Sequence, residues 1–265
     1  MIGARSASIN VMTAAARKAA RGLLRDFGEV EQLQVSKKGP GDFVSAADTR
    51  VEKVLRQELS KARPDYGFLL EESGEIPGND RHNCWVVDPL DGTTNFLHGI
   101  PHFAISIALV RDGEPISGVI YQPLTDELFW AEKGHGAFVN DRRLRVSARN
   151  KLEESVIATG IPHQGRPGHD RFIKQLSSVM TATAGVRRFG AASLDLAYVA
   201  AGRCEGFWEI GLKPWDIAAG IILVREAGGY VSEIDGGHDM LTSGHILAAN
   251  DRLHLPLGML LRQGV

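Results

Sequence analysis

The chain has 265 residues, of which 43% are hydrophobic and 23% charged, as is typical of a globular protein with a large core. A net charge of −2 gives no support for direct nucleic-acid binding, and no apolar run approaches the length that spans a membrane. The two cysteines, Cys84 and Cys204, lie far apart and outside any Cys-x-x-Cys motif. We therefore expect free thiols and a cytoplasmic location.

Helices open the first half of the chain, and strands follow. Apolar residues at helical spacing predict a helix over residues 5–27, stopped by Gly28, and a second helix that runs to about Arg63. Residues 37–42 between these helices have turn-forming composition. Neighbouring strands with short connections, typical of an antiparallel sheet, are predicted over 66–70, 84–87, 103–110, 116–121, 127–132 and 134–140.

From about residue 150, strands and helices alternate. We predict strands over 156–159, 186–189, 205–209, 230–233 and 246–249, and helices over 170–181, 193–201, 217–227 and 253–261. Such alternation is typical of an α/β arrangement. We therefore expect an α+β half over residues 1–148 and an α/β half over 149–265, joined in one compact body rather than through a linker.

The segment Trp85–Phe96 is the most informative part of the sequence. A strand delivers Asp88 at its carboxyl end, Pro89 is expected to turn the chain, and Asp91 follows on that turn. Gly92 allows a ligand to approach closely, and the Thr-Thr-Asn that follows suits a helix start, whose N–H groups favour phosphate. Two ionised carboxylates in so short a turn repel each other, and Mg²⁺ is the simplest compensation.

Two other segments supply further carboxylates. Glu71 and Glu72 follow the strand over 66–70, and Asp216 comes from the second half. Carboxylates that converge from strand ends and a helix start can build a multi-metal site for phosphoryl transfer. Each segment taken alone has a simpler interpretation: a turn for Asp-Pro-x-Asp-Gly, a solvated loop for Glu71-Glu72, and a helix N-cap for Asp216.

Taken together, Glu71–Ser73, Trp85–Asn95 and Trp215–Gly220 resemble the inositol monophosphatase family of metal-dependent, lithium-sensitive sugar phosphatases. The order and spacing of the three blocks match, and the stretch over 192–220 is similar to bacterial members. The resemblance implies a layered αβαβα sandwich with the active site between its two sheets. It also implies a homodimer, since members of the family are commonly dimers.

The resemblance further implies a set of metal ligands. Glu71 would bind the first metal with Asp88 bridging, and Asp91 and Asp216 would hold the second. The backbone carbonyl of Leu90 would be a further metal ligand. The family expectation is two or three Mg²⁺ ions per site.

Catalytic roles are implied for Glu72, Lys37, Asp48 and Thr93. Glu72 would orient a metal-bound water, Lys37 would lie on a loop near the metals, and Asp48 with Thr93 would position the attacking water. Structural alternatives remain for two of them. Asp48 has the position of a helix cap, and Lys37 that of a solvated loop charge.

Substrate contacts are implied for several positions in the two halves. The backbone N–H groups of Gly92 and Thr93 would face the phosphate, while Ala192, Glu209 and the metal ligand Asp216 would lie near the substrate hydroxyls. Exposure at a strand end is the alternative for Glu209. For His98 and His102, which flank the central motif, we expect structural roles, because no second His or Cys stands at ligand spacing.

The implied reaction is hydrolysis of a small phosphomonoester by a metal-activated water without a covalent enzyme intermediate. Inositol 1-phosphate is the expected substrate. Alternatives with the same chemistry are fructose 1,6-bisphosphate, histidinol phosphate, a nucleotide 3′-phosphate and NADP. An alternative of another class is a regulatory binding protein of the transcription machinery that retains the phosphatase fold. No Gly-x-Ser-x-Gly motif supports a serine hydrolase.

Overall fold

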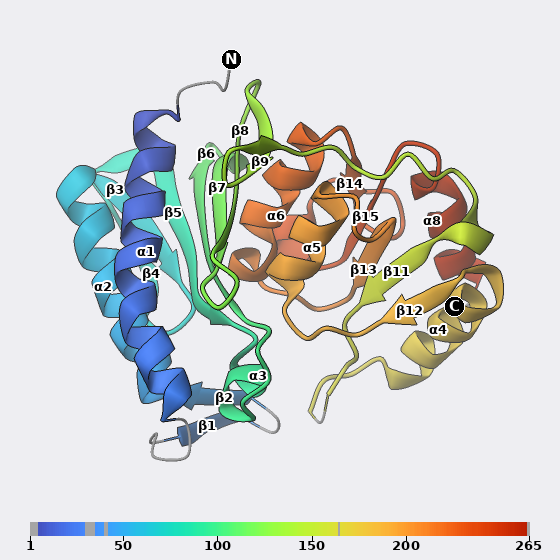
Figure 1. Ribbon diagram of the computed structural model, residues 1–265, viewed down its shortest axis with the longest axis horizontal. Helices are drawn as coiled ribbons and strands as arrows, with labels where there is room; N and C mark the ends of the chain where they lie inside the picture. Colours follow the sequence, from blue (N-terminus) through green and yellow to red (C-terminus); the bar gives the residue numbers. More distant parts are fainter. Residues whose placement is uncertain (1–4, 30–34, 40–41, 164, 264–265) are drawn as a thin grey trace.

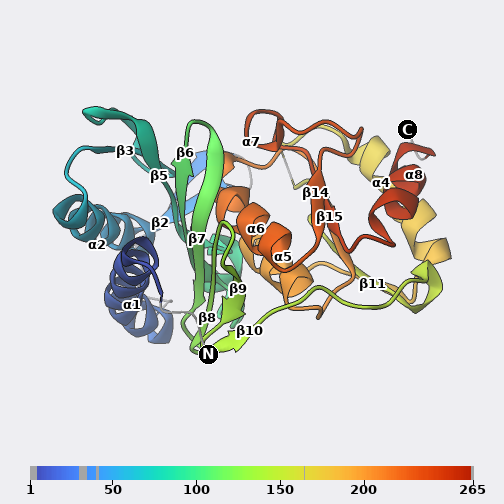
Figure 2. The same ribbon diagram turned by 90° about the horizontal axis from the view of Figure 1, so that it is seen from above.

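The protein consists of five layers of helices and sheets (Figure 1). The structure is a computed structural model, which describes residues 5–29, 35–39, 42–163 and 165–263. The outer helices α1 (Ala7–Gly28) and α2 (Ala46–Ala62) cover one face of the first sheet. The helices α5 (Ala192–Ala200) and α6 (Pro214–Glu226) lie between the two sheets. The view from above shows the same order of layers, with α4 (His169–Ala182) and α8 (His254–Gln263) on the far side (Figure 2). The expected αβαβα sandwich is confirmed.

The first sheet has eight strands, and all neighbours are antiparallel except β3 and β5. This pattern agrees with the antiparallel sheet expected from the short connections. The parallel pair matters for the site, because the carboxyl ends of β3 and β5 meet at one edge. In spatial order the strands are β10 (Arg142–Arg143), β9 (Gly136–Val139), β8 (Glu127–Glu132), β7 (Glu114–Gln122), β6 (Ala104–Arg111), β5 (Asp80–Asp91), β3 (Tyr66–Leu70) and β4 (Gly74–Ile76).

The second sheet is mixed. Its strands β11 and β12 run parallel, as do β11 and β13, whereas β15 pairs antiparallel with both β13 and β14. Parallel pairing brings the carboxyl ends of β11 and β13 to the same edge. In spatial order the strands are β12 (Gly185–Arg187), β11 (Val156–Thr159), β13 (Gly206–Glu209), β15 (Ile246–Ala249) and β14 (Tyr230–Ser232).

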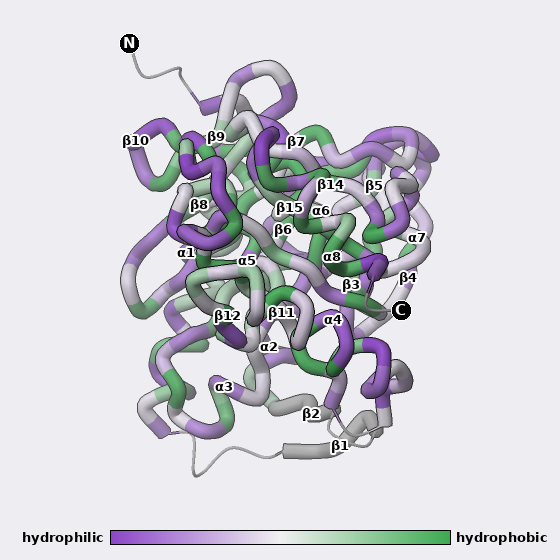
Figure 3. Tube along the Cα trace, turned by 90° about the vertical axis from the view of Figure 1, so that its right-hand side faces the viewer, coloured by the Kyte–Doolittle hydropathy of each residue, from purple (hydrophilic) through white to green (hydrophobic). Residues whose placement is uncertain are grey.

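The layers follow from the distribution of apolar residues. Helix α1 buries one face, including Ile9, Met12 and Leu23, against the first sheet, as its helical periodicity predicts. Helices α5 and α6 have buried residues on all sides, which suits helices enclosed between two sheets. Along the chain trace, hydrophilic residues gather in the peripheral loops (Figure 3).

The remaining elements are short and lie near the ends of the layers. Strands β1 (Val35–Gly39) and β2 (Asp42–Ser45) form an antiparallel hairpin, and α3 (Thr93–Leu97) contacts β2 at the lower end of Figure 1. Helix α7 (Met240–Ser243) and a 3₁₀ turn over Leu152–Glu154 complete the described elements.

Several boundaries differ from the sequence-based prediction. The segment over 37–42, expected as a turn, includes strand residues up to Gly39 and again at Asp42, and residues 40–41 between them lie outside the described residues. The turn expected at Pro89 is wrong: β5 continues to Asp91, since an irregularity in the pairing with β6 accommodates a residue without an N–H group. Helix α6 begins at Pro214, three residues before the predicted start, because proline suits the first turn of a helix.

In the part of the chain that the structure describes, no helix is long and apolar enough to cross a membrane. The division into halves at residue 148 stays a prediction.

Candidate active site

The parallel strands β3 and β5 place the first two carboxylates side by side. Leu70 lies opposite Val87, and the Glu71 N–H donates to the carbonyl of Val87 at 3.2 Å. The next residue of β5 is Asp88, and both the charge and the side chain of Glu71 raise its pKa. Two neighbouring carboxyl groups of this kind are stabilised by a shared proton or by a cation.

A bulge in β5 sets the positions of the two aspartates in the central motif. Asp88 pairs with Ser106 but Asp91 pairs with Ala104, so three steps along β5 oppose two along β6. The Asp88 carboxylate accepts a hydrogen bond from the backbone N–H of Leu90 at 2.9 Å. The chain therefore keeps both acids in the strand and buried at its end.

Asp91 is held from the other half of the chain. Its Oδ2 atom accepts hydrogen bonds from the backbone N–H of Ser193 at 2.7 Å and from the Ser193 hydroxyl at 2.5 Å. Burial raises the pKa of Asp91 to about 6, with a further increase from the charge of Glu71, while the Ser193 hydrogen bonds oppose this shift. Sequence reasoning missed Ser193, whose only local signal is its place in the first turn of a predicted helix.

Asp216 lies in the first turn of α6. Its Oδ2 atom accepts a hydrogen bond from the backbone N–H of Lys213 at 2.7 Å, the reach-back contact of a capping box. The capping role is therefore present, although at the third helical residue rather than at the N-cap. Burial raises the pKa of Asp216 to about 7, and the charge of Asp91 adds to the shift, so these two acids face a common region.

The pKa of Asp88 is raised as well. Burial raises its pKa well above the usual range, and the charges of Glu71, Asp91 and Asp216 raise it further. Within the described ranges, no three His, Cys, Asp or Glu side chains converge tightly enough to form a metal cluster by themselves. Each of Asp88, Asp91 and Asp216 accepts a hydrogen bond from a backbone N–H group.

The donor set nevertheless fits a divalent cation. All four groups are carboxylates, the ligands that Mg²⁺ prefers, and they influence one another electrostatically. A cation would compensate charges whose mutual repulsion and burial now favour protonation.

Thr93 and Asp48 lie together, as the resemblance implies. The Thr93 hydroxyl lies 3.1 Å from Oδ1 of Asp48, which is buried, and 2.9 Å from the carbonyl oxygen of Leu90. Helix α2 begins at Ala46, so Asp48 stands in its first turn.

Gly92 precedes α3 with a φ of +94°, a conformation that favours glycine. A Cβ atom there would lie 3.0 Å from the carbonyl oxygen of His102. The tight approach explains the glycine between Asp91 and Thr93.

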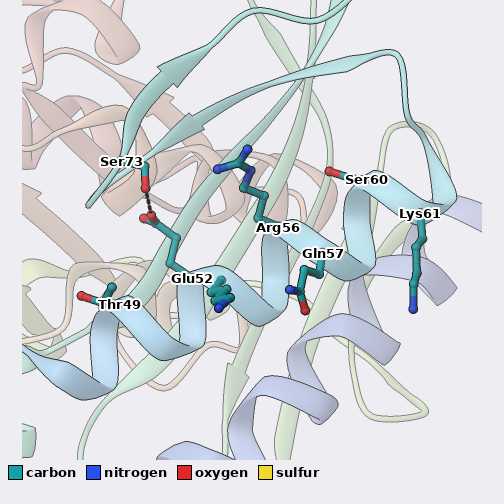
Figure 4. A pocket seen from close by; sticks show the side chains of 8 residues that line it. Thr49, Glu52, Arg56, Gln57, Ser60, Lys61 and Ser73 are labelled. Carbon is teal, nitrogen blue, oxygen red and sulfur yellow. Dashed lines mark hydrogen bonds between the residues drawn. The ribbon is translucent and has the colours of Figure 1, made fainter.

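The loop that carries Glu71 and Glu72 is braced by Glu52. This buried side chain of α2 accepts a hydrogen bond from the backbone N–H of Glu72 at 2.8 Å and another from the Ser73 hydroxyl (Figure 4). Sequence reasoning missed Glu52. The available signal was its spacing, since Glu52 follows Asp48 by four residues and the two share one helix face. The groove of about 790 Å³ in Figure 4, with Lys53 among its lining residues, lies beside this brace.

A cavity of about 130 Å³ contains the predicted residues of the second half. Its lining combines the carboxylates Asp91, Asp195, Glu209 and Asp216 with the cationic groups Arg166 and Arg188, and it also includes Gly160, Ile161, His163, Gly190, Ala191, Ala192 and Leu212. Ala192 and Glu209 are therefore brought together with two of the candidate metal ligands.

Glu209 lies directly over the backbone of Gly160. A Cβ atom on Gly160 would come within 1.9 Å of the Glu209 Cδ, so only glycine leaves room for this carboxylate. Burial raises the pKa of Glu209 to about 8, the charge of Asp216 raises it further, and Arg166 opposes the shift. The carboxylate thus faces the cavity that Asp216 also lines.

The remaining predicted residues lie as follows. The backbone of Lys37 pairs with Phe43 in the β1–β2 hairpin, and its side chain lies outside the described residues. His98 is exposed at the end of α3. His102 stacks on Phe189 with ring centroids 5.4 Å apart, and burial lowers its pKa, in line with a packing role.

Comparison with known proteins identifies the family of the chain. The sequence model described as "Inositol monophosphatase family" matches residues 5–263. An inositol-1-monophosphatase of Mesorhizobium japonicum is 62% identical over 94% of this chain and 93% of the relative. The Nus factor SuhB of Escherichia coli K12 is 44% identical over 92% of each chain. The crystal structure of the extragenic suppressor protein suhB from Bartonella henselae superposes with a TM-score of 0.96 at 58% identity, covering 98% of this chain and 100% of that one.

Proposed function

The chain belongs to the inositol monophosphatase family, and from this premise we propose that it is a Mg²⁺-dependent phosphatase that hydrolyses inositol 1-phosphate. One observation carries the proposal. Four acidic side chains, one directly after β3, two in β5 and one in α6, interact electrostatically beside a small cavity lined by Glu209 and Ala192. Burial of several like charges is costly unless a cation compensates them, which supports a metal site.

Glu71, Asp88, Asp91 and Asp216 are the residues that would hold the ions, together with the backbone carbonyl of Leu90. Divalent ions in such a site supply Lewis-acid activation of water and neutralise charge on the phosphoryl oxygens. We propose two or three Mg²⁺ ions for this role, since the donors are all oxygen atoms.

The residues around these ligands would prepare the reaction. Thr93 and buried Asp48 are hydrogen-bonded, so the pair can accept a proton from a water and hold that water in line with the ester bond. Gly92 and Thr93 would offer backbone N–H groups to the phosphate. Glu72 stands beside Glu71 on the loop that Glu52 braces and would orient a second water. Lys37 would add a positive charge near the phosphate.

The polyol would occupy the cavity of about 130 Å³. Glu209 would accept a hydrogen bond from a hydroxyl group, and the backbone of Ala192 would contact a second hydroxyl. The direct packing of Glu209 on Gly160 fixes the acceptor in place. Acceptors for hydroxyl groups favour a polyol such as inositol 1-phosphate over histidinol phosphate, whose single hydroxyl group is esterified.

Phosphate release from a substrate panel tests the proposal. The purified protein is incubated with inositol 1-phosphate and with the four alternative substrates, each in Mg²⁺ and in EDTA. We expect release to be fastest from inositol 1-phosphate and to disappear in EDTA. Faster release from another member would replace the substrate, and undiminished release in EDTA would contradict the metal-dependent chemistry.

Three finer properties belong to the same proposal. We expect inhibition by lithium, which would replace one Mg²⁺, and assembly as a homodimer. We also propose a cytoplasmic setting, which is supported by the free thiols of Cys84 and Cys204. Full activity in tens of millimolar LiCl would contradict the inhibition by lithium. A monomer in analytical ultracentrifugation would contradict the homodimer.

A second candidate function is regulatory binding to the transcription machinery, because the relative from Escherichia coli bears the name of a Nus factor. The two functions are separable with the variant Asp91→Asn. A regulatory role independent of catalysis predicts that wild type and variant retain the same transcription proteins from lysate, whereas a purely enzymatic role predicts that neither retains them.

A further inference from the structure

Asp195 is a buried acid that the proposed chemistry does not yet use. It stands three residues after Ala192 in α5, so the two residues share the helix face that lines the cavity. Its side chain is 1% exposed, and its Oδ1 atom has no hydrogen-bond partner among the described residues. Buried carboxylate oxygens in folded proteins nearly always have a donor, so this exception calls for one.

The charges around Asp195 restrict what this donor can be. Asp195, Glu209 and Asp91 line the same cavity, and burial together with the charges of the other two acids raises the pKa of Asp195 well above the usual range. An anionic group is disfavoured next to Asp195 and Glu209. A cationic group is disfavoured by Arg166 and Arg188, which line the same cavity. A neutral donor such as a hydroxyl group satisfies both conditions.

We propose that Asp195 is a further specificity-determining residue, which accepts a hydrogen bond from one hydroxyl group of the substrate while Glu209 accepts from another. The inference rests on the proposed function, because it concerns the polyol part of the same substrate. The substrate class is a phosphomonoester whose ring carries at least two free hydroxyl groups within reach of both acids. The positive charge of Arg188 stabilises the ionised forms of Asp195 and Glu209, since it opposes the increase in the pKa of both acids.

Asp195 should then have opposite effects on the stability of the empty protein and on the binding of substrate. Without substrate, a buried carboxyl group lacking a donor lowers the stability of the fold. When substrate binds, the same group discriminates strongly between substrates with and without a hydroxyl group at this position. An analogue that lacks the hydroxyl group leaves the buried acceptor without a hydrogen-bond donor. A purely structural acid would show neither effect.

The test compares Asp195→Leu and Asp195→Asn with wild type on inositol 1-phosphate and on p-nitrophenyl phosphate, which has no hydroxyl groups. For Asp195→Leu we expect kcat/KM for inositol 1-phosphate to fall about 10- to 100-fold, and that for p-nitrophenyl phosphate to stay within about twofold. Asp195→Asn keeps one acceptor oxygen and should lose less. The exposed acid Asp251 provides the control variant Asp251→Asn, which should match wild type.

Product inhibition and melting temperature supply readouts that do not depend on turnover of one substrate. Free inositol should inhibit Asp195→Leu more weakly than wild type, while inhibition by inorganic phosphate stays the same. The melting temperature of metal-free Asp195→Asn should equal or exceed that of wild type. Equal losses on both substrates, or unchanged inhibition by inositol, would overturn the inference. A wild-type protein inactive on inositol 1-phosphate would contradict the proposed function and the inference with it.

Discussion

Asp88 and Asp91 show how single residues define this site. The bulge in β5 keeps both acids in the strand, and each is then fixed by an N–H group, from Leu90 and Ser193 respectively. The side chain of Thr93 completes the group by joining Asp48 to the carbonyl of Leu90. Backbone N–H groups from two distant parts of the chain therefore orient these two candidate ligands.

Thr93→Val tests the water-positioning pair, because valine keeps the shape of threonine but has no hydroxyl group. We expect kcat for phosphate release to fall by at least about 100-fold, since positioned proton transfer contributes on that scale. The matched variant Thr93→Ser restores the hydroxyl group and should retain most of the activity. Equal losses in both variants would indicate that packing of the methyl group, and not the hydroxyl, is responsible.

Helix α2 shows how one element serves the site from a distance. Asp48 and Glu52 lie four residues apart on its inner face, and the first contacts Thr93 while the second holds the loop of Glu72. The helix packs against α1 and the first sheet, so this face is rigidly placed.

Glu52→Gln should weaken the hold on the loop that carries Glu71. The amide offers one acceptor oxygen where the carboxylate offers two, and we expect a loss of about 1–3 kcal/mol in the free energy of unfolding. The Mg²⁺ concentration for half-maximal activity should rise as well. Glu58→Gln on the same helix changes an exposed contact with Lys18 and is expected to alter neither quantity. Thermal unfolding measures the change in stability, and a Mg²⁺ titration of activity measures the half-maximal concentration. If Glu52→Gln has the same stability and the same half-maximal Mg²⁺ concentration as Glu58→Gln, Glu52 does not hold the loop.

At the scale of the whole molecule, the sequence predicted elements better than the contacts between them. The strands over 66–70, 127–132, 156–159 and 246–249 match the structure, because apolar runs bounded by turn residues mark their ends. The β1–β2 hairpin was missed, because glycine and charged residues obscure its alternation.

Only the part of the candidate site that lies at the ends of predicted strands could be predicted from the sequence. Glu71 and Asp88 follow from strand ends, but Ser193 lies 102 residues from Asp91, and no local pattern predicts that pair. Asp195 likewise gains its significance only from the cavity that the fold creates. Contacts between the halves depend on how the layers pack, and a single sequence does not specify that packing directly.

Phosphate release from inositol 1-phosphate by wild type and Asp91→Asn, each at saturating Mg²⁺ and in EDTA, tests the central claim most directly. Asparagine keeps an oxygen for the Ser193 hydrogen bonds but removes one of the buried charges that repel each other. We therefore expect Asp91→Asn to be folded and at least as stable as metal-free wild type. The variant should release no phosphate even at saturating Mg²⁺, and wild type should release none in EDTA. Near-normal release by the folded variant at saturating Mg²⁺ would show that this carboxylate does not hold a catalytic metal.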